Sequence, residues 1–155
     1  MVVKPKKPLE SYTDIETDVD KLTIIVANAE RHGEMEYALA ARRQRAILRG
    51  AKDVELELRF DQIIEAYEAM LTEKNKRTTK ASRTRMKVKS KGIEKTIIDW
   101  AKSATPAEGF TSLIKDGRPE LTAEYLVVEL QDRFSAEVVE AASKRLLHHG
   151  VKLPV

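Results

Sequence analysis

The chain has 155 residues, which is enough for one domain with its own core or for two very small ones. Apolar residues make up 42%, charged residues 34% and aromatic residues only 5%, a composition that favours helices. The absence of cysteine excludes disulfides, cysteine-bound zinc and thiol catalysis. The same absence indicates a reducing compartment, so we expect a cytoplasmic protein. No apolar run reaches the length that a membrane-spanning helix needs.

The first ten residues predict a flexible basic arm. Lys4, Lys6 and Lys7 alternate with prolines, which favour an extended chain. The stretch also lacks the apolar core of a signal peptide.

The first helix is predicted to begin at Thr13, because Thr13 and Glu16 have the spacing of a capping box. Apolar residues then recur at steps of three and four, and Gly33 can close the helix in the left-handed conformation. These apolar residues are Ile15, Val19, Leu22, Val26 and Ala29.

A second helix is predicted from Glu34 to Arg49, antiparallel to the first across the Gly33 turn. Its buried side would carry Met35, Leu39, Ala46 and Ile47. Arginines crowd its second half, where positive charge suits the helix dipole. They form a second candidate cluster for contact with a polyanion, namely Arg42, Arg43 and Arg45.

A third helix is predicted between Asp53 and Lys74. Apolar residues alternate from Val54 to Phe60, which on its own is a strand pattern. The surrounding Glu, Leu and Arg residues are strong helix formers, however, and the apolar spacing turns helical after Phe60.

The stretch from Lys74 to Lys95 has the most unusual charge in the sequence. It holds ten Lys or Arg residues and one acid, a net charge of 10 − 1 = +9. The whole chain has 28 basic and 25 acidic residues, so the remainder has 18 and 24, a net charge of −6. A block of like charge repels itself and attracts a counter-charge, which nucleic-acid phosphate can supply.

Residues 76–79 of this segment lack apolar side chains and are predicted to form a loop. Thr79 or Ser82 could cap a short helix that reaches Lys89. The basic residues that alternate from Arg83 to Lys89 would lie on one face of a strand, whereas on a helix they would spread around it. We favour the helix over an extended ribbon because its neighbours are helical.

Gly92 allows a turn into a further helix that ends near Lys102. A short helix, a turn and another short helix give the outline of a helix-turn-helix unit. The single tryptophan, Trp100, lies among apolar residues of the second of these helices, so we expect it in the core rather than stacked on bases.

Three more helices are predicted in the C-terminal third. Thr105 precedes a proline and an acid in the pattern of a helix start. Thr122 would cap the next helix and Ser135 the last one.

These elements predict an all-α fold of about eight short-to-medium helices, packed as successive helical hairpins with a basic loop and short helix near the middle. We expect one helical domain over residues 11–150, between the arm at 1–10 and a tail at 151–155. The basic segment at 74–95 could separate an N-terminal three-helix part from a C-terminal four-helix part.

No catalytic motif is present. The three histidines lack the spacing of a helical metal site, and there is no Gly-x-Ser-x-Gly elbow and no Gly-rich phosphate loop. Asp116, Glu120 and Glu129 could hold Mg²⁺ in a nuclease only if they converged in space. We therefore expect no metal and no cofactor, and lean away from an enzyme.

The sequence predicts a small helical nucleic-acid-binding protein, with duplex DNA favoured over RNA; a DNA-binding protein would be associated with the nucleoid. Phosphate contacts would come from Arg77, Lys80, Arg83, Arg85, Lys87, Lys89 and Lys91. One alternative is a helical adaptor whose basic segment docks onto an acidic protein partner. Another is an accessory part of a nuclease system.

Overall fold

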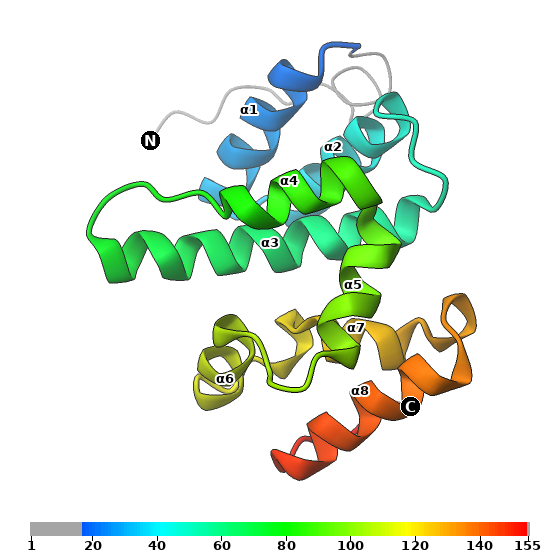
Figure 1. Cartoon of the computed structure of the whole chain (residues 1–155). Helices are drawn as coiled ribbons and strands as arrows, with labels where there is room; N and C mark the ends of the chain where they lie inside the picture. The colour runs from blue at the N-terminus through cyan, green and yellow to red at the C-terminus, as the bar shows by residue number, and fades with distance from the viewer. Residues whose placement is uncertain (1–16, 155) are drawn as a thin grey trace. The chain divides into compact units, whose positions relative to one another are not determined.

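The computed structural model describes residues 17–154 except for the side chain of Glu108, and every regular element within them is helical (Figure 1). This part of the chain forms eight α-helices and two short 3-10 helices, and it contains no strand. The predicted all-α fold is therefore confirmed. The chain divides into two compact units, residues 1–58 and 59–155, and the division falls inside one long helix. The predicted arm at 1–10 lies outside the described residues.

The first unit contains a hairpin of α1, Val19–Arg31, and α2, Met35–Leu48. The two helices are joined through Gly33, whose φ of 72° is a left-handed conformation that glycine adopts without strain. The predicted pairing of the two helices is correct. The hairpin core consists of Leu22, Val26 and Ala41, with Ile25 packed against it.

Helix α1 begins later than predicted. Asp18 is its N-cap, and the Asp18 carboxylate accepts hydrogen bonds from the backbone N–H groups of Asp20 at 2.9 Å and Lys21 at 3.3 Å. Asp18 itself is extended, so a helix that runs on continuously from Thr13 is wrong. The predicted capping box at Thr13–Glu16 lies outside the described residues.

Helix α2 buries a different side from the predicted one. Ala46 is buried as expected, but Met35, Leu39 and Ile47 are 62%, 42% and 52% exposed. The buried residues are instead Ala38, Ala41, Arg42, Arg45 and Ala46. Small alanine side chains let two helices approach closely, and a search for large apolar residues does not detect such a face.

Helix α3, Val54–Asn75, is helical throughout, as predicted, and runs from the first unit into the second. Its start is supported by Asp53, whose carboxylate accepts the backbone N–H of Leu56 at 3.2 Å. Phe60, Ile63 and Ile64 are buried at helical spacing. The alternation before Phe60 therefore did not produce a strand.

The second unit continues with five more α-helices. Helix α5 packs on α7 and α8, which also pack on each other. Fully buried side chains of this core are Ile97 on α5, Leu126 and Val127 on α7, and Leu146 on α8. The bounds are α4, Ser82–Lys91; α5, Ile93–Lys102; α6, Glu108–Lys115; α7, Ala123–Glu129; and α8, Ala136–His148, with 3-10 turns at Pro119–Leu121 and Gln131–Arg133.

Two of the three predicted caps in this unit are confirmed. The hydroxyls of Thr122 and Ser135 accept the backbone N–H three residues further on, at 3.1 and 3.4 Å. The predicted start at Thr105 is wrong, because α6 begins at Glu108. The Thr105 carbonyl accepts the Ser103 hydroxyl at 2.6 Å instead. Within residues 17–154, no helix combines the length and the apolar content that crossing a bilayer requires.

Candidate nucleic-acid interface

The basic segment forms a loop and then helix α4, so the helical alternative for this stretch is correct. Residues 76–81 connect α3 to α4, and α3 fixes the loop through Thr79. The Thr79 N–H donates to the Thr72 hydroxyl at 2.9 Å, and the Asn75 amide donates to the Thr79 hydroxyl at 3.3 Å. The predicted caps, Thr79 and Ser82, are not used, since α4 begins without a side-chain cap of its own.

A carboxylate from α3 holds the start of α4. Glu68 is 5% exposed, and it accepts the backbone N–H of Ala81, the residue before α4, at 2.9 Å. Arg85 donates to the same carboxylate twice, from Nε at 2.7 Å and from Nη2 at 2.6 Å. Lys80 Nζ lies 3.9 Å from it. This bidentate arrangement is the strongest that an arginine and a carboxylate can form.

The charge of Glu68 is maintained by these partners. Burial on its own would raise the pKa of Glu68, but the hydrogen bonds from Arg85 and Ala81 and the charges of Arg85 and Lys80 outweigh burial and lower it. The hydrogen bond to Glu68 in turn raises the pKa of Arg85. Both groups are therefore charged at neutral pH, and the pair fixes α4 to α3.

The other end of α4 is held from α5 by Asp99. Asp99 Oδ2 lies 2.9 Å from Lys87 Nζ and 3.6 Å from Lys91 Nζ. The hydrogen bond from Lys87 lowers the pKa of Asp99. The Asp99 side chain is 39% exposed, and ion pairs in contact with water contribute little to stability. Mobile anions can therefore compete with Asp99 for these two lysines.

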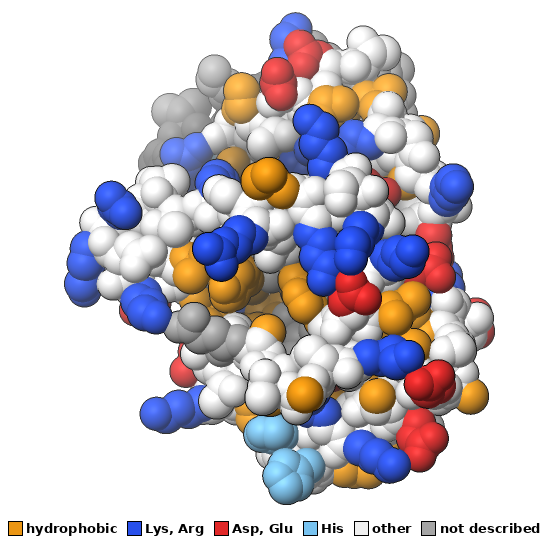
Figure 2. Space-filling view, viewed as in Figure 1, with side chains coloured by type: hydrophobic (Ala, Val, Ile, Leu, Met, Phe, Trp, Pro, Cys, Tyr) orange, Lys and Arg blue, Asp and Glu red, His pale blue; other side chains and the backbone are white. Residues whose placement is uncertain are grey.

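Three of the seven predicted phosphate contacts, which we call the outward row, are not held by these anchors. Arg77 in the loop and Arg83 and Lys89 on α4 are exposed, and none of the acids whose side chains the structure describes pairs with them. Met86, between the two helical members, is 70% exposed. Lys and Arg side chains gather over α4 in the space-filling view (Figure 2). The other four predicted contacts, Lys80, Arg85, Lys87 and Lys91, bind acids of the protein itself.

Helices α4 and α5 meet at a single residue, Gly92, whose φ of 91° only glycine adopts easily. The Thr96 hydroxyl donates to the Gly92 carbonyl at 2.9 Å. Helix-turn-helix units have a turn of three or four residues. The predicted short helix, turn and short helix are present, but the connection is shorter than in that motif.

The second predicted cluster does not form one surface. Arg42 and Arg45 are 5% and 3% exposed, and only Arg43 of the three is exposed. Arg42 forms an ion pair with Glu30, and Arg45 donates to the Thr23 hydroxyl at 3.0 Å. Arg42 and Arg45 therefore join α2 to α1 rather than presenting charge to a partner.

The acids considered for a nuclease do not assemble a metal site. Among residues 17–154, no three His, Asp or Glu side chains are grouped so that they could hold a metal ion. Arg59 on α3 instead contacts the Glu129 carboxylate at 2.7 Å and the Glu120 carbonyl at 3.2 Å. Asp116 lies exposed in the turn after α6.

Comparison of the chain with models of known protein families, with curated proteins and with solved structures gives no match. The function of the protein therefore has to be inferred from the side chains of the basic segment.

Proposed function

We propose that the protein binds nucleic acid, with duplex DNA as the preferred form, through phosphate contacts of the basic segment. The observation that carries this proposal is the outward row, Arg77, Arg83 and Lys89. These side chains are exposed and have no acidic partner in the described part of the chain. Uncompensated cations on a fixed helix suit a polyanion such as phosphate.

The charge balance supports the same proposal. The seven cations predicted to contact phosphate carry a charge of +7, and the carboxylates of Glu68 and Asp99 bind four of them. Seven cations against these two carboxylates leave 7 − 2 = +5. The anchors reduce the positive charge of the segment but do not neutralise it.

The two helical members of the outward row can contact different phosphates. Arg83 and Lys89 are six residues apart, which is about 9 Å along the helix axis and about 120° around it. Their long side chains therefore leave α4 in different directions and would reach phosphates on either side of the helix. The exposed hydroxyls of Ser82 and Ser90 flank the two cations and can donate to phosphate oxygens.

The test is a salt titration of binding to a short random-sequence DNA duplex, followed by fluorescence anisotropy. A triple variant, Arg77→Gln, Arg83→Gln and Lys89→Gln, should bind more weakly. The slope of log affinity against log salt should fall by about 0.9 for each phosphate that the variant no longer neutralises, up to about 2.7 in total. An RNA duplex of the same sequence, used as competitor, distinguishes the two nucleic acids.

The matched control changes three exposed cations elsewhere in the second unit, Lys115→Gln, Arg118→Gln and Lys152→Gln. It alters the net charge equally and should leave the slope close to that of wild type. Equal affinities and slopes for the triple variant and wild type would show that the outward row is not the interface. If wild type shows no duplex binding at low salt, the adaptor that docks onto an acidic protein becomes the better proposal.

A further inference from the structure

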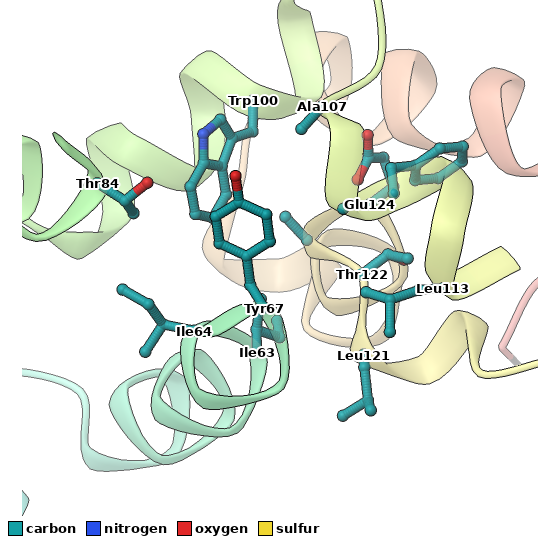
Figure 3. Close-up of a pocket in the computed structure, with 13 residues that line it drawn as sticks. Ile63, Ile64, Tyr67, Thr84, Trp100, Ala107, Leu113, Leu121, Thr122 and Glu124 are labelled. Carbon is teal, nitrogen blue, oxygen red and sulfur yellow. The ribbon is translucent and has the colours of Figure 1, made fainter. Parts of the chain in front are cut away.

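The second unit contains a pocket of about 90 Å³ between α3, α4, α5, α6 and α7. In Figure 2 hydrophobic side chains line a hollow between α4 and α6. Tyr67 and Trp100 lie on one side of the pocket and the Glu124 carboxylate on the other (Figure 3). The apolar wall includes Ile63, Ile64, Leu113 and Leu121 together with the rings of Tyr67, Trp100 and Phe110.

Polar groups in the wall are few. Thr84 contributes a hydroxyl from α4, and none of the side chains that the structure describes forms a hydrogen bond with it. Glu124 on α7 is 3% exposed and forms an ion pair of 2.9 Å with Arg145. The pair carries no net charge, so Glu124 offers its oxygen atoms as hydrogen-bond acceptors without adding an uncompensated charge to the described lining.

We propose that this pocket binds a small uncharged ring compound that carries one hydroxyl or N–H donor. Three aromatic rings and the aliphatic side chains of two isoleucines and two leucines favour a flat apolar ring. The volume of about 90 Å³ is smaller than the enclosed cavity of about 150 Å³ that accommodates benzene, so the pocket takes no more than one ring and encloses it only in part, with the rest of the ligand beside the exposed Ala107. The hydroxyl or N–H group of the ligand would donate a hydrogen bond to the Glu124 carboxylate or to the Thr84 hydroxyl oxygen. A charged ligand would lose its hydration without gaining a counter-ion, because Arg145 already neutralises Glu124.

This site is independent of the proposed nucleic-acid binding and is tested separately. Benzyl alcohol serves as the uncharged probe, with benzylammonium and benzoate as its charged counterparts. Trp100 is the only tryptophan and lines the pocket, so its fluorescence reports occupancy directly. We expect benzyl alcohol to change this fluorescence saturably and to raise the melting temperature. Both ions should bind roughly tenfold more weakly or worse.

Two variants test whether the response to benzyl alcohol comes from binding in the pocket. Ala107 lines the pocket and is exposed, so Ala107→Leu should obstruct the mouth and abolish the response to benzyl alcohol. Ala104 is equally exposed but does not line the pocket, so Ala104→Leu should respond as wild type does. Far-ultraviolet dichroism checks that both variants fold.

Three results would overturn the proposal: no saturable response to benzyl alcohol, equal binding of benzylammonium or benzoate, or an unaffected response in folded Ala107→Leu protein. The charge comparison uses wild-type protein alone, so it decides the question even if Ala107→Leu does not fold.

Discussion

Arg145 on α8 donates a hydrogen bond of 2.9 Å to the buried carboxylate of Glu124 on α7. The same guanidinium donates to the carbonyl of Trp100 at 3.0 Å and to the carbonyl of Ser103, at the end of α5. One side chain thus connects three helices of the second unit. Burial nevertheless raises the pKa of Glu124, because the interaction with Arg145 offsets only part of the loss of hydration.

Because the pKa of Glu124 is raised in the folded protein, Glu124 makes the free energy of unfolding depend on pH. The folded state holds the proton more tightly than the unfolded state, so the contribution of Glu124 is fully present below its usual pKa of 4.5. It is lost as the pH rises through the raised pKa, by at most about 1.4 kcal/mol per pH unit. Glu124→Gln should remove this part of the pH dependence in urea unfolding, whereas Glu94→Gln, at an exposed site, should retain it. If the free energy of unfolding changes with pH in the same way for wild type and Glu124→Gln, the expectation is contradicted.

Glu68→Gln should loosen α4, because Gln cannot maintain the charge-assisted pair with Arg85. We expect the free energy of unfolding at neutral pH to fall by about 1–3 kcal/mol, a range that allows for the partial exposure of Arg85. The lowered pKa of Glu68 means that its contribution is present above the usual value of 4.5 and is lost as the pH falls through the folded pKa. Urea unfolding followed by dichroism measures the difference, and Glu73→Gln, an exposed change on the same helix, is the control. A loss no larger than that of the control would show that Glu68 does not anchor α4.

Asp99→Asn should strengthen duplex binding, whereas the triple variant of the outward row should weaken it. It frees Lys87 and Lys91 from their carboxylate, so duplex affinity should rise. The salt slope should steepen by about 0.9 for each additional phosphate that these lysines neutralise, up to about 1.8. Asp116→Asn changes the net charge equally at an exposed turn and should have a much smaller effect. If the two variants bind alike, the lysines held by Asp99 do not contribute to binding.

The rings of Phe60 and Trp100 stack with centroids 5.9 Å apart and an angle of 18°. We expect Trp100→Ala to lower the free energy of unfolding by about 3 kcal/mol, near the lower limit for a large aromatic side chain because Trp100 is partly exposed. A double-mutant cycle of Phe60→Leu and Trp100→Leu should give a coupling of about 0.5–1.5 kcal/mol. Additive effects in the cycle would mean that the stacking itself contributes nothing.

Local spacing was enough to predict most of the helices. The Gly33 and Gly92 turns and the Thr122 and Ser135 caps each depend on residues within a few positions of one another, so the sequence pattern contains them. The α2 face was predicted wrongly because its contacts use alanines and the buried Arg42, which no count of large apolar residues identifies.

Less of the candidate site than of the fold could be predicted from the sequence. The charge density of residues 74–95 indicates where a polyanion would bind, but not which cations are occupied within the protein. Arg85 and its partner Glu68 are 17 residues apart, and Arg145 and Glu124 are 21 apart, so both pairs depend on how helices pack. The pocket depends on five helices together and has no local signature.

The two acids that hold α4 differ in their contact with water. The side chain of Glu68 is 6% exposed, whereas that of Asp99 is 39% exposed. Salt screens an exposed pair far more than a buried one. A rise in ionic strength should therefore release Lys87 and Lys91 from Asp99 while Arg85 stays bound to Glu68, so the number of unpaired cations on α4 depends on the ions around it.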